Sequence, residues 1–167
     1  MSDHPRSVPI PPGRVAAVDY GRRRMGLAIC DAERIIASPM PMREPGADVG
    51  AEEAFFRRLV AEEGIVGFVV GLPVHADGNA SRMSAEVERF AAWLSATTGL
   101  PVTFQDERYS SREAAGKLAG LGLSRGKKKA RSDSIAAQIV LAAWMEDEAA
   151  RHRSGAPAPS SPGALDG

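Results

Sequence analysis

The spacing of apolar and polar positions changes several times along the chain, and each change marks an expected element. Three short apolar runs come first, "RVAAVDY" (14–20), "MGLAIC" (25–30) and "RIIASPM" (34–40), and each has the length of a β-strand. Their connections are too short for a crossover, so we expect three antiparallel strands. We expect Pro39 to end the third strand.

A helical period follows. In "GAEEAFFRRLVAEEG" (50–64) the apolar side chains at 55, 56, 59 and 60 are separated by Glu and Arg, which predicts an amphipathic helix that Gly64 ends. The next run, "IVGFVVG" (65–71), is apolar throughout, as in a central parallel strand covered on both faces. A second amphipathic helix has its apolar stripe at 83–94 and ends at Gly99.

The remaining elements complete an α/β pattern. We expect a fifth strand over 101–105, a short helix in "SSREAAGKLAGLG" (110–122), and a last helix from Ser132 to about Arg151. Three hairpin strands followed by right-handed crossovers predict a five-stranded mixed sheet flanked by helices, with the spatial order 3-2-1-4-5. Ligand sites of such sheets lie beyond the carboxyl ends of the strands, so residues at that edge are the first candidates for function.

Composition adds an outline of the domain. The N-terminal residues 1–13 are rich in proline, and residues 153–167 are mainly Pro, Gly, Ser and Ala, so we expect a flexible first segment, one domain over 14–152 and a disordered tail. Lys plus Arg and Asp plus Glu both total 21, so net charge indicates no partner. The single cysteine, Cys30, excludes an internal disulfide. No stretch has the length of a membrane span or the pattern of a signal peptide, which predicts a cytoplasmic protein.

Three acids fall at the predicted ligand edge. Asp19 ends the first strand, Glu107 follows the fifth, and Asp133 lies where we expect the last helix to begin. Each alone has an ordinary explanation, as a turn aspartate, a surface acid or a helix-capping group. Together, converging carboxylates repel one another unless a cation lies among them, and Mg²⁺ or Mn²⁺ prefers such oxygen ligands. Gly71, at the end of the strand between them, leaves room for the ion.

Cations are concentrated beside these acids. Arg22, Arg23 and Arg24 directly follow Asp19, and "RGKKKAR" (125–131), predicted to be a loop, precedes Asp133 with five positive charges in seven residues. Such clusters favour a polyanion, with affinity gained by counterion release from each neutralised phosphate. The sequence therefore indicates chemistry on phosphates.

Four motifs carry a specific resemblance. "DYGRRRMG", "VGLPVHADGNAS", "DERYSS" and "ARSDSIAAQIVL", in this order, resemble the YqgF family of bacterial proteins over roughly residues 14–147. Members are similar to Holliday-junction resolvases and are described as pre-16S rRNA nucleases. The resemblance implies a ribonuclease-H-like fold. It also implies an endonuclease that cleaves structured nucleic acid with Mg²⁺ or Mn²⁺, as a monomer or a homodimer. Its expected substrate is pre-rRNA, which would bring it to ribosomal precursor particles, or branched DNA.

The resemblance also assigns roles to individual residues. Asp19, Glu107 and Asp133 correspond to the family's catalytic, metal-binding acids. Expected nucleic-acid contacts are Arg22, Arg23, Arg24, Arg108, Lys127, Lys128, Lys129 and Arg131. The family often has a hydroxyl residue and a lysine at positions 22 and 23. Resolvases usually carry a further acid after the one in the last helix, where this chain has Ser134, Ile135 and Ala136, so the nuclease assignment is better supported than the resolvase one.

Two other classes of function stay open. A phosphotransferase of the actin and sugar-kinase type also begins with a strand ending in Asp-x-Gly, but it typically needs two such domains, and this chain has room for one. A non-catalytic RNA-binding assembly factor would suit the basic segments as well. Aromatic residues make up only 5% of the chain, which disfavours a platform stacking successive bases.

Overall fold

The structure is a computed structural model that describes residues 8–21, 23–46, 48–72, 78–106 and 125–153, with the description of 78–84, 125–133 and 153 limited to the backbone. Five strands form one sheet: β1 (Arg14–Asp19), β2 (Met25–Cys30), β3 (Ala37–Arg43), β4 (Ile65–Leu72) and β5 (Val102–Asp106). Their order is β3-β2-β1-β4-β5. β2 is antiparallel to β1 and β3, whereas β4 is parallel to β1 and β5. The predicted mixed sheet and its strand order are confirmed.

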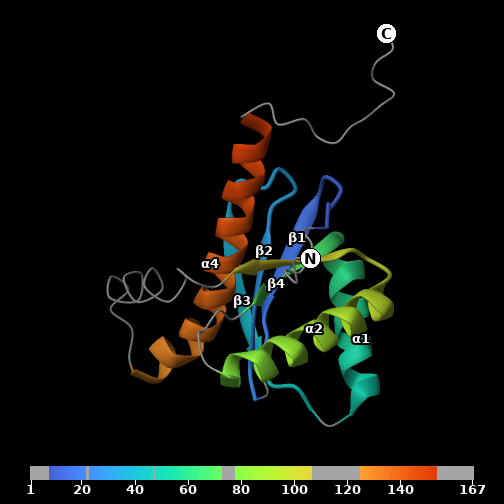
Figure 1. Cartoon of the computed structure of the whole chain (residues 1–167), viewed down its shortest axis with the longest axis vertical. Coiled ribbons are helices and arrows are strands. Elements are labelled where there is room, and N and C mark those ends of the chain that lie inside the picture. The colour runs from blue at the N-terminus through green and yellow to red at the C-terminus, as the bar shows by residue number, and fades with distance from the viewer. Residues whose placement is uncertain (1–7, 22, 47, 73–77, 107–124, 154–167) are drawn as a thin grey trace.

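Three described helices cover the sheet: α1 (Val49–Glu63), α2 (Gly78–Thr98) and α4 (Arg125–Arg153). Figure 1 shows α4 on one side of the strands and α1 with α2 on the other. Side chains that alternate along each strand therefore enter two different cores. No helix within the described ranges is both long and apolar enough to span a membrane.

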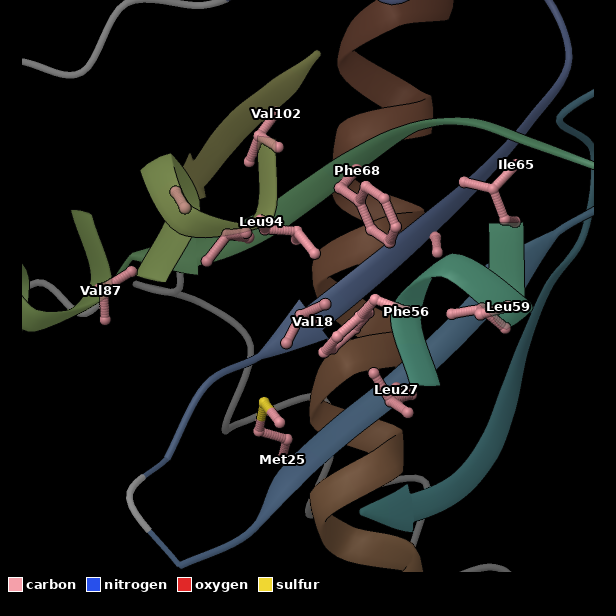
Figure 2. Close-up of a cluster of buried hydrophobic side chains, with 13 residues drawn as sticks. Val18, Met25, Leu27, Phe56, Leu59, Ile65, Phe68, Val87, Leu94 and Val102 are labelled. Carbon is pink, nitrogen blue, oxygen red and sulfur yellow. The ribbon is translucent and has the colours of Figure 1, made fainter. Parts of the chain in front are cut away.

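The core between the sheet and the α1–α2 layer is the larger one. Phe56 of α1 is fully buried and points towards Val18 of β1, with Phe68 of β4 beside it (Figure 2). The rings of Phe56 and Phe68 meet edge to face at 6.1 Å, a geometry that aromatic pairs prefer. The second core joins Val15, Ala17 and other strand residues to the face of α4 that carries Leu141 and Trp144.

The predicted end of α1 at Gly64 is confirmed, and Asp48, which was not predicted, caps its start. The carboxylate of Asp48 accepts hydrogen bonds from the backbone N–H of Gly50 at 2.9 Å and of Ala51 at 3.4 Å. Gly64 ends the helix in the left-handed conformation at φ 66°, and its N–H donates to the carbonyl of Val60. Glycine is suited to this position because it has no Cβ to clash there.

Two predicted elements had wrong bounds. The third strand, expected over 34–40, is Ala37–Arg43, and Pro39 does not end it but pairs with Ala28 inside β3. β3 is an edge strand of the sheet, where the missing N–H of proline is tolerated. The last helix begins at Arg125, and not at Ser132. The five residues 127–131 are all good helix formers, and Gly126 lies in the first turn and does not interrupt them. The helix predicted over 110–122 lies outside the described residues.

The residues just before β1 contact the sheet. Val8 donates its N–H to Thr103 Oγ1 at 3.0 Å, and the side chain of Ile10 is buried over Gly67. A Cβ on Gly67 would lie 2.5 Å from Cγ2 of Ile10, so glycine is what lets this segment pack so closely. The guanidinium of Arg34 also binds this segment, because it donates hydrogen bonds to the carbonyls of Gly13, at 2.9 Å, and of residue 11. The predicted domain boundaries themselves stay predictions.

Candidate active site

Asp19 is the last residue of β1 and is half-buried. Val15 and Ala17, four and two positions earlier, are buried in the core under α4, so strand alternation places the Asp19 side chain on the same face. The chain turns sharply after it, and a Cβ on Gly21 would lie only 2.5 Å from the backbone oxygen of Arg24. The glycine is therefore required for the turn that ends β1 at the carboxylate.

Glycines flank this carboxylate on both neighbouring strands. Asp19 pairs directly with Gly26 of β2. On the other side Val18 pairs with Val70 of β4, which puts Gly71 level with Asp19. Paired residues of neighbouring strands project from the same face, so neither strand places a side chain beside the carboxylate. The room at Gly71 was predicted from the sequence, but the matching position of Gly26 was missed, because it becomes visible only through the antiparallel register.

The end of β5 lies two strands from Asp19. Gly71 of β4 pairs with Gln105, and Leu72 pairs with Asp106, the last described residue before Glu107. Neighbouring strands lie about 4.8 Å apart, so β1 and β5 are separated by roughly 10 Å at this level. Glu107 itself lies outside the described residues, and its position relative to Asp19 stays a prediction.

The first half of α4 crosses the same edge of the sheet. Ser134 is 3% exposed, and its hydroxyl donates to the carbonyl of Met40 in β3 at 2.5 Å. Met40 pairs with Leu27, which pairs with Val18, the residue before Asp19. The backbone of residue 133 therefore lies near the level at which β1 ends. It lies inside α4, two turns after the start of the helix, so the expected helix-capping position of Asp133 was wrong, whereas its role as a ligand stays a prediction.

The described end of β5 contacts the other half of α4. Gln105 donates its Nε2 to Oδ2 of Asp147 at 3.2 Å. Asp147 is fourteen residues beyond Asp133, or roughly 21 Å along the helix axis. For Glu107 to meet Asp133, the chain after Asp106 must therefore turn back along α4 towards its first half. Within the described ranges no three His, Cys, Asp or Glu side chains lie close enough together to hold a metal ion.

The predicted cationic contacts are described only in part. Arg23 is exposed and Arg24 half-buried in the turn between β1 and β2, next to Asp19. Lys127, Lys128, Lys129 and Arg131 belong to the first two turns of α4, so the segment predicted as a loop is helical. Arg22 and Arg108 lie outside the described residues. The first basic segment thus follows the end of β1 directly, the second precedes Ser134 in α4, and their contacts with nucleic acid stay predictions.

An apolar pocket opens beside this edge on the opposite face of the sheet. Its volume is about 210 Å³, and it lies between the β1–β2 turn, the start of α1 and the face of α2. The pocket is lined by Tyr20, Met25, Pro45, Gly46, Val49, Glu52, Phe90 and Trp93. It was not predicted from the sequence, because these side chains have the spacing of ordinary core positions.

Among the described lining residues Glu52 is the one with a charged side chain, and Arg43 at the end of β3 binds it. Arg43 donates Nε to Oε1 and a second guanidinium nitrogen to Oε2, both at 2.9 Å, and the Gly46 N–H donates to Oε2 at 3.1 Å. The bidentate bond from Arg43, with the Gly46 N–H, holds the pKa of Glu52 below its ordinary value despite burial. The guanidinium also lies 4.0 Å from the centre of the Phe55 ring.

Comparison with known proteins identifies relatives along almost the whole domain. A family model described as "RuvX: Holliday junction resolvase" matches residues 13–147. A protein of Rhodopirellula baltica named "Putative pre-16S rRNA nuclease" is 43% identical over 141 residues, which are 84% of this chain and 80% of that protein. Proteins with the same name from Chlorobium luteolum and Chromobacterium violaceum are 40% and 41% identical, over 82% and 78% of this chain and 96% and 95% of their own lengths.

A solved structure shares the fold. The chain resembles the structure titled "T. thermophilus RuvC in complex with Holliday junction substrate" with a TM-score of 0.56 and 16% sequence identity, over 83% of this chain and 96% of that one. At this identity the likeness concerns the fold alone. It confirms the expected ribonuclease-H-like architecture.

Proposed function

Because the chain belongs to the RuvX family of Holliday junction resolvases, which is also the YqgF family, we propose that it is a metal-dependent endonuclease. It hydrolyses phosphodiester bonds of structured nucleic acid in the cytoplasm, and the 5′ end of pre-16S rRNA in ribosomal precursor particles is the substrate we favour. Cleavage of Holliday junctions is the second candidate, favoured by the description of the family. The relatives named above carry the rRNA assignment.

The position of Asp19 is the single observation that supports this proposal most. Its carboxylate ends β1 between two glycines, on the face that the first half of α4 crosses. A half-buried carboxylate whose paired neighbours on both adjacent strands are glycines suits a hard divalent cation, which needs oxygen ligands. The site residues thus fit Mg²⁺ or Mn²⁺, with Asp19, Glu107 and Asp133 as the ligands.

The chain's own residues divide the work of hydrolysis. Asp19, Glu107 and Asp133 would hold the divalent ions, which would supply an activated water and neutralise the charge that develops on the phosphate. Arg23, Arg24 and the basic turns of α4 position the backbone of the nucleic acid and carry no sequence information of their own.

A cleavage panel tests the reaction. Wild-type protein, Asp19→Asn and Asp31→Asn are compared on a precursor 16S rRNA 5′ segment and on a four-way DNA junction, with Mg²⁺ and with EDTA. Asp31 is a matched control because its carboxylate accepts backbone N–H groups, including those of Ile35 and Ile36 at 2.8 Å each, in the turn at the other end of the sheet. We expect Asp19→Asn and EDTA to reduce cleavage about a thousandfold or more, the equivalent of several kcal/mol.

The outcomes separate the candidates. Cleavage of the rRNA segment alone supports pre-rRNA processing, and cleavage of the junction alone supports the resolvase. Cleavage by Asp19→Asn at the wild-type rate would reject the metal site. RNA binding that persists in EDTA, with no cleavage under any divalent ion, would make the protein an assembly factor.

The contact role of α4 has its own test. Replacing Lys127, Lys128 and Lys129 by glutamine should weaken binding and reduce the slope of log K against log[salt] by about 0.7 to 0.9 for each phosphate that is no longer neutralised. Replacing Arg57 and Arg58, exposed on α1 on the other side of the sheet, is the control and should leave the slope unchanged. An unchanged slope in the lysine variant would refute the contact.

A further inference from the structure

We propose that the pocket between the β1–β2 turn, α1 and α2 binds one unstacked nucleobase of the substrate, a site that rests on the proposed function. Tyr20, which lines it, directly follows Asp19 in the chain. The carboxylate lies on the α4 face of β1, and the next side chain enters the pocket on the opposite face. A nucleotide next to the reacting phosphate can therefore pass the end of β1 and place its base in the pocket on the opposite face.

The walls of the pocket suit a flat ring. The chain has five Phe, two Trp and two Tyr, and three of these nine line this one pocket. The rings of Tyr20 and Phe90 lie 4.7 Å apart with a tilt of 30°, and those of Phe90 and Trp93 lie 5.8 Å apart with a tilt of 31°. All three side chains are only half-buried, so ring surface remains accessible. Aromatic side chains stack bases of any sequence, because every base has a π-face.

Size and charge narrow the class of ligand. Sites for drug-sized ligands usually measure about 300–1,000 Å³, so a pocket of about 210 Å³ suits a single ring system. Among the described residues the lining includes no lysine or arginine, and the one acid among them, Glu52, is paired with Arg43. A phosphate would find no cation among these side chains, whereas an uncharged base needs none.

The lining offers almost no exposed polar surface, so binding would rest on stacking against the rings and not on a hydrogen bond to the edge of the base.

A binding experiment with single abasic sites tests this pocket. Short single-stranded oligonucleotides, each with one base removed at a different position, are titrated in EDTA against wild type, Phe90→Leu and Phe104→Leu. Leucine keeps an apolar side chain at each position but removes the ring. Phe104 is the matched control, because it is a half-buried phenylalanine packed on the same core that does not line the pocket.

We expect one abasic position to weaken wild-type binding by about fivefold to a hundredfold, the value of one stacked base. Phe90→Leu should bind the intact strand more weakly by a similar factor and lose its sensitivity to that position, while Phe104→Leu should behave as wild type. Equal affinity for every abasic strand would overturn the proposal. A Phe90→Leu variant that is as sensitive as wild type to the abasic position would also overturn it. The pocket would then be assigned to an apolar side chain of a protein partner.

Cleavage by the wild type with Mg²⁺ is scored separately, so that the two proposals fail independently. Position-dependent binding without cleavage keeps the base pocket and rejects the nuclease. Cleavage without any position-dependent binding keeps the nuclease and rejects the pocket.

Discussion

Replacing Glu52 with glutamine should destabilise the fold by removing one charge from a mostly buried ion pair. The side chains of Arg43 and Glu52 are only 25% and 11% exposed, and they share a bidentate contact with both bonds at 2.9 Å. Hydrogen bonds to a charged group contribute about 1.5–3 kcal/mol, so we expect Glu52→Gln to lose about 2 kcal/mol of unfolding free energy. Such a loss lowers the melting temperature of a domain of this size by about 4–8 °C.

The pH dependence identifies the cause of this loss. The pKa of Glu52 is lowered in the folded protein, first by the bond from Arg43, so the folded state favours the ionised form. The stabilisation is fully present above the pKa of glutamate in the unfolded chain, about 4.3, and it is lost as the pH falls through the lower pKa of the folded state. The difference between wild type and Glu52→Gln should therefore narrow below about pH 4.

Urea denaturation of both proteins between pH 3 and pH 7 measures this difference. Glu62→Gln is the control, because Glu62 is exposed on the same helix and should change stability by less than about 0.5 kcal/mol. A Glu52→Gln variant as stable as wild type at pH 7, or a difference that stays constant on acidification, would refute the reasoning.

Three further substitutions test how the fold positions the site. Gly21→Ala should disrupt the β1–β2 turn, because its Cβ would meet the Arg24 backbone oxygen at 2.5 Å. Circular dichroism melting should show a loss of more than about 1 kcal/mol of unfolding free energy. Cleavage should fall by more than the unfolded fraction explains, and normal cleavage would contradict the role of the turn. Gly64→Ala should cost only about 1 kcal/mol in the same melt, since φ is 66° but nothing lies within 4 Å, and unchanged cleavage is expected. Ser134→Ala removes the bond to Met40 and should cost about 1–2 kcal/mol of unfolding free energy, while Ser134→Thr should restore part of it if the bond is the cause.

Local signals were sufficient to predict most of the fold. The short apolar runs predicted the strands, the connections between them predicted the strand order, and Gly64 marked the end of α1. The boundaries that were wrong depend on competition between signals. Pro39 suggests a strand end, yet an edge strand accepts it, and Ser132 suggests a helix start, yet the helix formers before it continue the helix to Arg125.

The site could be predicted less completely, because it depends on contacts between distant segments. The position of Asp19 at the end of a strand followed from pattern alone, whereas its pairing with Gly26 follows from the register. The bond from Gln105 to Asp147 joins residues 42 apart and has no local signature. In the same way, Tyr20 and Phe90 show a pocket only when β1 and α2 are packed together.

Binding of Mn²⁺ tests the central claim most directly, because it depends on the acids and not on the choice of substrate. Electron paramagnetic resonance counts the ions bound by wild type, Asp19→Asn and the control Asp31→Asn in the absence of nucleic acid. The metal site predicts that wild type and Asp31→Asn bind Mn²⁺ alike and that Asp19→Asn loses this binding. An Asp19→Asn variant that retains the wild-type number of ions and their affinity would contradict it.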